Sequence, residues 1–154
     1  MIRRVRRGVV SLLELVLVSV IIVVFAAVAV PRYGRASARY QSDLAVRRVA
    51  SDLAQAQSYA RTTGASQTVV FSVAANRYQL MNALPLDGAS GSYTVDLAAA
   101  PYRARLVSAN FNGAAQVVFN GWGLPDSGGS VVVAVGLQQQ TITVDAETGQ
   151  ISVQ

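Results

Sequence analysis

The hydrophobic pattern is most extreme near the N-terminus. Residues 9–30 are almost uniformly apolar, and Glu14 is the only charged side chain among these 22 residues. A helix rises about 1.5 Å per residue, so this stretch would extend about 33 Å, which is enough to cross a bilayer. The pattern therefore predicts a transmembrane helix that carries one carboxylate.

Beyond Pro31 the apolar positions become periodic instead of continuous. They recur at spacings of three and four, as on one face of a helix, at Val46, Val49, Leu53, Ala56 and Ala60. Thr62, Thr63 and Gly64 provide a C-terminal stop signal. The two stretches together predict one long helix over residues 9–63, bent near Pro31 because proline interrupts the helical hydrogen bonds. We interpret the charged residues of its second half, Arg39, Asp43, Arg47, Arg48 and Asp52, as a solvated face.

From Ser66 onward the apolar residues alternate with a period of two. The alternation predicts a first hairpin from residues 67–73 and 77–81, and a second hairpin within residues 141–153. Further strand candidates cover residues 92–97, 103–107, 115–120 and 130–135. Seven or eight short strands after a helix predict an α+β fold in which the long helix packs on an antiparallel β domain. The segment NGWGLPDSGG, residues 120–129, is the richest in turn residues and is expected to be a mobile loop.

The composition restricts the chemistry that the chain can perform. It contains no cysteine and no histidine, which excludes disulfides, the usual nucleophilic triads and zinc sites. The acidic residues are scattered, and no glycine-rich phosphate loop is present. We therefore expect no catalytic function, no cofactor and no metal site.

The positive charge is concentrated at the N-terminus. The chain has 13 basic and 8 acidic residues, a formal net charge of +5. Four arginines precede the apolar stretch, at positions 3, 4, 6 and 7, and without them 9 basic residues face 8 acidic ones. The charge therefore belongs mostly to a possible leader peptide and gives little support for nucleic-acid binding.

Two export signals offer other interpretations of the N-terminus. Ala27, Val28 and Ala29 would suit a signal-peptide cleavage site, and Arg6 with Arg7 would suit a twin-arginine signal. Both leave Glu14 unexplained, since an acid near the centre of an inserted helix costs about 3 kcal/mol. The apolar stretch is also long for a signal peptide, which favours a membrane anchor.

The stretch SLLELVLVSVIIVVFAAVAVP resembles the N-terminus of type IV prepilins and type II secretion pseudopilins. The resemblance implies that a membrane peptidase removes a short basic leader after a glycine and methylates the new N-terminus. It also implies a glutamate fifth in the mature chain and a helix-bending proline 17 residues later, as Glu14 and Pro31 are spaced here. Cleavage after Gly8 would make Val9 the first residue, whereas counting from Glu14 would make it Val10, and both frames stay open.

With this resemblance, the chain divides into four segments. They are a prepilin leader (1–8), the transmembrane half of the helix (9–30), its amphipathic half (31–64) and a periplasmic β domain (65–154). Glu14 would neutralise the new α-amino group of a neighbouring subunit, because a close pair of opposite charges offsets much of the cost of burying each. The alternative is a glutamate that is protonated or that reaches the headgroup region.

Three motifs in the rest of the chain restrict the resemblance to one branch of these proteins. DLAQAQSYARTTG, VVFNGWGLP and TITVDAETGQISV together resemble the GspH/FimT branch of minor pseudopilins and minor pilins. This implies a non-catalytic minor pseudopilin of a type II secretion pseudopilus, single-pass in the bacterial inner membrane, with its C-terminal domain in the periplasm or on the filament. The implied partners are other pseudopilins or pilins, the prepilin peptidase, the inner-membrane assembly platform and, before assembly, membrane lipid.

The alternative is a FimT-like minor type IV pilin that acts in pilus assembly or DNA uptake. Some such relatives bind DNA through arginines near the C-terminal end, but no basic residue follows Arg105 in this chain. Arg103 and Arg105 flank Ala104 and could share a strand face, which makes a weak basic patch. We interpret that patch as a solvated strand and do not expect nucleic acid as a partner.

Overall fold

The computed structural model describes residues 11–81 and 93–154, apart from the side chains of residues 28–33 and 35. The chain forms two compact units, Met1–Ser37 and Ala38–Gln154. The first unit holds the N-terminal part of helix α1 (Leu12–Thr63), which continues into the second unit. Within the described part of the chain, no helical stretch combines the length and the hydropathy that a membrane crossing requires.

The amphipathic half of α1 packs as the spacing predicts. All five predicted apolar positions, from Val46 to Ala60, are buried in the core of the second unit, and Ala45 joins them. The helix ends at Thr63, because Gly64 takes a positive φ of 66° that other residues rarely adopt. The predicted C-terminal end of the helix is therefore confirmed.

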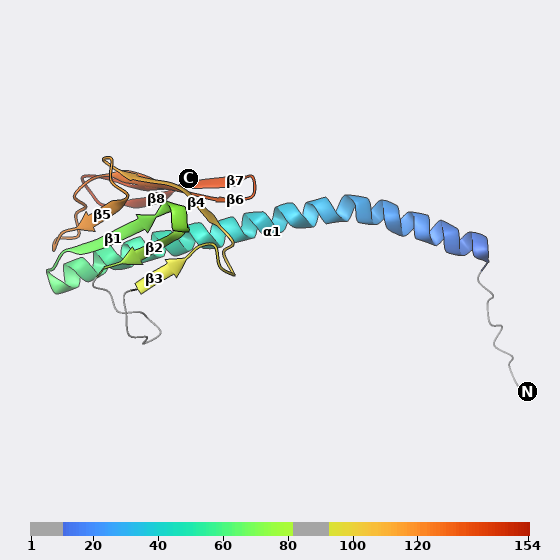
Figure 1. Ribbon diagram of the computed structural model, residues 1–154, viewed down its shortest axis with the longest axis horizontal. Coiled ribbons are helices and arrows are strands. Elements are labelled where there is room, and N and C mark those ends of the chain that lie inside the picture. The colour runs from blue at the N-terminus through green and yellow to red at the C-terminus, as the bar shows by residue number, and fades with distance from the viewer. Residues whose placement is uncertain (1–10, 82–92) are drawn as a thin grey trace, which may run out of the picture. The chain divides into compact units, whose positions relative to one another are not determined.

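The second unit contains two antiparallel four-stranded sheets (Figure 1). The first has the order β3-β2-β1-β5, with β1 (Gln67–Ser72), β2 (Arg77–Leu80), β3 (Tyr93–Asp96) and β5 (Gln116–Phe119). The second has the order β4-β6-β7-β8, with β4 (Arg105–Phe111), β6 (Gly129–Val135), β7 (Gln138–Val144) and β8 (Ile151–Val153). A short 3-10 helix, η1 (Val73–Ala75), connects β1 to β2. Both predicted hairpins, β1 with β2 and β7 with β8, are confirmed.

One hydrophobic core joins the buried face of α1 to the inward side chains of both sheets. Phe71 of the first sheet contacts Tyr78 and also Phe111 of the second sheet, with ring centroids 5.7 and 5.8 Å apart. Aromatic contacts of this kind add to the free energy gained by burying apolar surface. The predicted α+β fold, a helix packed on antiparallel sheets, is confirmed.

Two local predictions are wrong. Strand β4 begins at Arg105, and Arg103 precedes it with a positive φ of 46°, so the two arginines do not share a strand face. Asp52 was expected on a solvated face, yet it is only 3% exposed. A carboxylate is buried at this position because three side chains donate hydrogen bonds to it.

Candidate functional site

The residues predicted for leader cleavage and for filament assembly all lie in the N-terminal part of the chain. Gly8, Val9 and Val10 lie outside the described residues. Glu14 is exposed in the first turn of α1, and Pro31 lies within the same helix. The predicted cleavage site, the role of Glu14 and the bend at Pro31 stay predictions.

The start of α1 exposes apolar side chains on every face. From Leu12 to Phe25 the large apolar residues range from 46% exposed at Ile21 to 80% at Leu12. A helix that is apolar all round needs an apolar environment, which lipid or other apolar helices can supply. This segment is therefore a candidate surface for assembly.

Arg103 and Arg105 border a hollow of about 370 Å³, which Asn76, Ala134 and Gly136 also line. Both arginines are exposed, while Ala104 between them is buried. The Asn76 side chain supports this region, since its Oδ1 accepts a hydrogen bond of 2.9 Å from the Leu106 backbone N–H. Arg103 and Arg105 thus lie on the rim of a hollow and not on a strand face, and their role as a basic patch stays a prediction.

Asp52 lies at the centre of a polar cluster that we call the Asp52 network: Arg48, Asp52, Tyr78 and Tyr93. The Tyr78 hydroxyl donates to Oδ2 at 2.5 Å, and Arg48 Nε donates to the same oxygen at 3.1 Å. The Tyr93 hydroxyl lies 3.1 Å from Oδ1 and also accepts a hydrogen bond from Arg48. The network ties α1 to β2 and β3 and so fixes the edge of the first sheet on the helix.

Electrostatics hold both tyrosines of the network in the neutral form. Burial disfavours the phenolate, and the nearby Asp52 charge disfavours it further, so the pKa of Tyr78 is raised well above its ordinary value of 10.0. The same two causes raise the pKa of Tyr93. Burial disfavours the charged form of Arg48, but the nearby Asp52 and the neighbouring tyrosines together outweigh that effect, so the arginine pKa is raised. Arg48 therefore keeps its positive charge at physiological pH.

Gln57 joins two loops that are far apart in the sequence. Its Nε2 donates to the backbone oxygen of Gly123 at 2.8 Å and to that of Gly149 at 3.1 Å. Gly149 has a positive φ of 67°, and a Cβ at that position would lie 2.5 Å from Gln57 Nε2. This close approach explains why glycine is required there. Gln57 therefore brings together the three sequence motifs that resemble the GspH/FimT branch.

The loop between β5 and β6 is fixed by hydrogen bonds, although the sequence suggested mobility. Asn120 Oδ1 accepts from the backbone N–H groups of Trp122 and Leu124 at 2.9 and 3.0 Å. Arg61 Nε donates to the Trp122 carbonyl at 3.1 Å. The Trp122 side chain nevertheless remains 83% exposed, beside a hollow of about 540 Å³ lined by Arg61, Gly64, Gly121 and Trp122. An exposed tryptophan on a fixed backbone is a candidate anchor for a partner.

Sequence reasoning missed Asp52, Gln57 and Trp122. The tyrosines gave a signal for Asp52, since Tyr78 and Tyr93 alternate with Leu80 and Val95 and must point inward, where their hydroxyls need partners. No local signal identified Gln57, because its acceptors are backbone carbonyls 66 and 92 residues further along the chain.

The family model described as "Type II transport protein GspH" matches residues 45–149. The chain belongs to the GspH family. The matched range contains the Asp52 network, Gln57 and both loops that Gln57 joins. A search of proteins with curated functions finds none that matches this GspH-family chain in sequence.

Among solved structures, the chain resembles the type IV minor pilin FimU of Pseudomonas aeruginosa strain PAO1, in two crystal forms. The first has a TM-score of 0.54 at 11% sequence identity and covers 75% of this chain and 90% of FimU. The second has a TM-score of 0.51 at 10% identity, with 73% and 91% covered. At this identity the likeness shows a shared fold, and the GspH-family chain is pilin-like in architecture.

Proposed function

We propose that this chain is a non-catalytic minor pseudopilin of a type II secretion pseudopilus. It assembles through its N-terminal helix into a membrane-anchored filament that supports protein export. The observation that carries the proposal is the exposed apolar start of α1 with one carboxylate, Glu14, in its first turn. Membership of the GspH family and the pilin-like fold support it.

In this proposal the prepilin peptidase removes residues 1–8 after Gly8, or residues 1–9, so that the mature chain starts at Val9 or Val10. Residues 9–30 lie in the lipid of the bacterial inner membrane as a single pass before assembly, and the helix bends near Pro31. Residues 65–154 form the periplasmic domain. The inner-membrane platform then moves the subunit into a filament of other pseudopilins, whose apolar helices replace the lipid.

Glu14 acts in this proposal as the assembly residue. A carboxylate in the first turn of a helix is favoured by the positive end of the helix dipole. In an apolar bundle it also needs a cation, because an unpaired buried charge is costly. The new α-amino group of a neighbouring subunit supplies that cation, which fixes the register between adjacent helices.

Filament incorporation of Glu14 variants tests this function. Glu14→Ala and Glu14→Gln should both lose incorporation, since neither carries the charge that pairs with the amino group. If Glu14 were instead protonated in the membrane, Glu14→Gln would incorporate normally, and so this variant separates the two explanations. Ser51→Ala is a control, because Ser51 is exposed on the part of α1 that lies in the second unit. Normal incorporation of Glu14→Ala would refute the proposed role.

A FimT-like role in pilus assembly or DNA uptake is the second candidate. The hollow between Arg103 and Arg105 favours it, because two exposed arginines on one rim can contact neighbouring phosphates. DNA retention that falls with salt and disappears in the R103A/R105A variant would support DNA uptake. Absence of retention at low salt would support the export function instead.

A further inference from the structure

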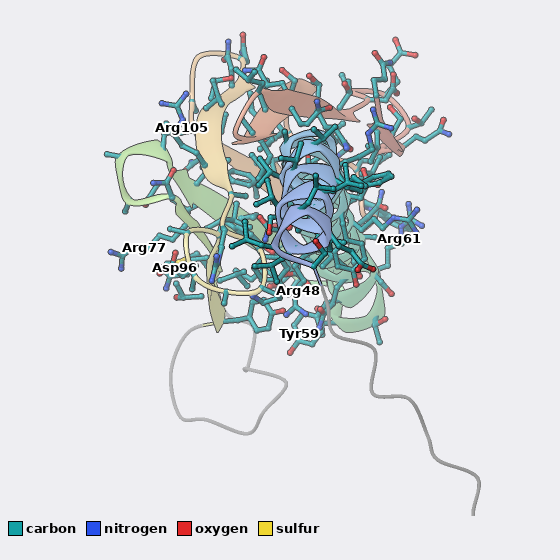
Figure 2. All side chains as sticks on the ribbon, turned by 90° about the vertical axis from the view of Figure 1, so that its right-hand side faces the viewer. Arg48, Tyr59, Arg61, Arg77, Asp96 and Arg105 are labelled. Atoms are coloured by element: carbon teal, nitrogen blue, oxygen red, sulfur yellow. The ribbon has the colours of Figure 1, made fainter. Side chains whose placement is uncertain are left out.

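The C-terminal end of α1 and the β5–β6 loop together form a surface that we call the Trp122 platform. It consists of the four residues that line the hollow of about 540 Å³, namely Arg61, Gly64, Gly121 and Trp122. Close backbone contact fixes the two elements on each other, since a Cβ on Gly121 would lie 2.5 Å from the carbonyl oxygen of Gly64. Figure 2 shows Arg61 on the opposite side of the second unit from Arg105, so the platform is separate from the hollow beside Arg105.

Glycine residues leave the surface beside Trp122 open. Gly64 and Gly121 line the hollow and contribute only backbone atoms to it. Gly123 has a positive φ of 75°, and a Cβ there would overlap the Arg61 side chain, which therefore lies directly against the Gly123 backbone. Among the four residues of the platform, only Trp122 has an apolar side chain, and at 83% exposed its ring is accessible to a ligand.

Arg61 presents free hydrogen-bond donors at the same hollow. Its Nε donates to the Trp122 carbonyl oxygen at 3.1 Å, which orients the guanidinium group. Within the described part of the chain, the structure shows no hydrogen-bond partner for its two terminal Nη groups, and the side chain is exposed. A guanidinium group held in one plane can donate two hydrogen bonds to neighbouring oxygen atoms of a ligand. The platform therefore combines an aromatic face with a forked donor.

This combination suits a sugar ring. The C–H groups on one face of a pyranose ring carry partial positive charge, which the negative face of an indole attracts. The oxygen atoms at the edge of the ring accept hydrogen bonds, and Arg61 supplies the donors. The volume of the hollow, about 540 Å³, falls within the range of about 300–1,000 Å³ that is typical of small-molecule sites. A polar ligand also fits a site in which one aromatic ring is the only apolar side chain.

The residues around the platform disfavour a nucleic acid or a protein as the ligand. Three exposed acidic residues lie in the β5–β6 loop and the β7–β8 turn, Asp126, Asp145 and Glu147. Gln57 holds these two loops together, and hydrogen bonds from Thr148 and the Glu147 backbone lower the pKa of Asp145, which keeps it charged. These charges would repel a row of phosphates. A protein contact needs further apolar groups around its anchor, whereas no apolar side chain besides Trp122 lines this hollow.

We propose that the Trp122 platform binds a saccharide, with a sugar ring stacked on the indole and its oxygen atoms bound by Arg61. The ligand is an N-acetylated glycan, the class of sugar polymer from which the cell wall in the periplasm is built. This choice of glycan rests on the proposed function, which places the β domain in the periplasm. An acetamido group suits the platform, because its carbonyl oxygen is a strong acceptor for the Nη groups of Arg61.

A fluorescence titration of the detergent-solubilised full chain tests the site, because Trp122 is the only tryptophan in the sequence. The detergent must lack a sugar headgroup, which would compete for the platform. The β-1,4-linked trimer of N-acetylglucosamine should change the tryptophan emission in a saturable way. R61A should weaken this binding at least about fivefold through loss of the donors. R105A is the matched control, because it removes an exposed arginine away from the platform and should leave the binding unchanged.

Calorimetry extends the test to W122A, which lacks the fluorophore and should show no binding. R61A and W122A should both melt within about 2 °C of the wild type, since both side chains are exposed, so lost binding would not reflect unfolding. A flat titration of the wild type up to about 10 mM trimer would overturn the saccharide site, because a site with a Kd of about 1 mM would be nearly full at that concentration.

Other ligands give outcomes that separate the parts of the proposal. Tighter binding of a single-stranded oligonucleotide than of the sugar trimer would overturn the saccharide site, and so would undiminished binding of the trimer by W122A. Equal affinity for a trimer of glucose would overturn the choice of an N-acetylated glycan. Absence of the wild-type chain from filaments would refute the proposed function and with it the choice of cell-wall glycan, whereas a saturable titration would still support the saccharide site.

Discussion

Replacing Asp52 with alanine should destabilise the second unit strongly. The substitution removes the acceptor of hydrogen bonds from Tyr78, Tyr93 and Arg48. The Tyr78 hydroxyl is enclosed in the core and cannot reach water, and an unsatisfied buried donor costs about 1–3 kcal/mol. Tyr93 keeps its contact with Arg48, whose side chain is 36% exposed and can turn toward solvent. The total loss in free energy of unfolding is therefore about 3 kcal/mol, below the value for a fully buried ion pair.

Thermal unfolding followed by circular dichroism measures this loss in the detergent-solubilised full chain. A domain of this size loses roughly 3–6 °C in Tm for each kcal/mol, so Asp52→Ala should melt at least about 10 °C below the wild type. Tyr78→Phe, which removes one donor, should show an intermediate loss. Glu147→Ala is the control at an exposed acid and should change the free energy by less than about 0.5 kcal/mol. A Tm for Asp52→Ala within 2 °C of the wild type would refute the inference that the network is stabilising.

Three further predictions concern the same unit. Above pH 10, Tyr78 and Tyr93 ionise in the unfolded chain but stay protonated in the folded chain. The free energy of unfolding should therefore fall by about 1.4 kcal/mol per pH unit for each tyrosine as the pH rises above 10. Denaturant titrations of the Y78F/Y93F variant should lack this part of the pH dependence. Gln57→Ala should lower the free energy of unfolding by about 1–2 kcal/mol, because it removes the hydrogen bonds to Gly123 and Gly149. Gln57→Glu should lower it more, because a carboxylate would face the same two carbonyl oxygens. Gly149→Ala should lower the free energy of unfolding less in the Gln57→Ala variant than in the wild type, because the new Cβ no longer clashes with Gln57 Nε2. Equal losses in the two backgrounds of this double-mutant cycle would contradict the close contact.

The sequence predicted the elements better than their arrangement. Periodicity of 3.6 located the buried face of α1, and Gly64 located the helix end, because both signals are local. The strand order could not be predicted, since β1 pairs with β5 across more than 40 residues and nothing local specifies that neighbour. The sequence therefore did not predict the grouping of the strands into two sheets.

The sequence also placed two polar residues wrongly, because their surroundings depend on distant parts of the chain. Asp52 was misjudged because its spacing from Arg48 equally suits an exposed ion pair, and only the two inward tyrosines decide that it is buried. Arg103 was misplaced because alternation with Ala104 imitates a strand, whereas its positive φ ends the extended backbone. Local periodicity identifies a face of an element, but the partner of that face depends on the rest of the fold.

The most direct measurement is the intact mass and N-terminal sequence of the native protein extracted from membranes. The proposal predicts a chain that starts at Val9 or Val10, with the mass of one added methyl group on its N-terminus. Such a start would place Glu14 sixth or fifth and support its pairing with a neighbouring amino group. A chain that still starts at Met1, or one that starts at Val30 after loss of the whole apolar stretch, would contradict assembly through the N-terminal helix.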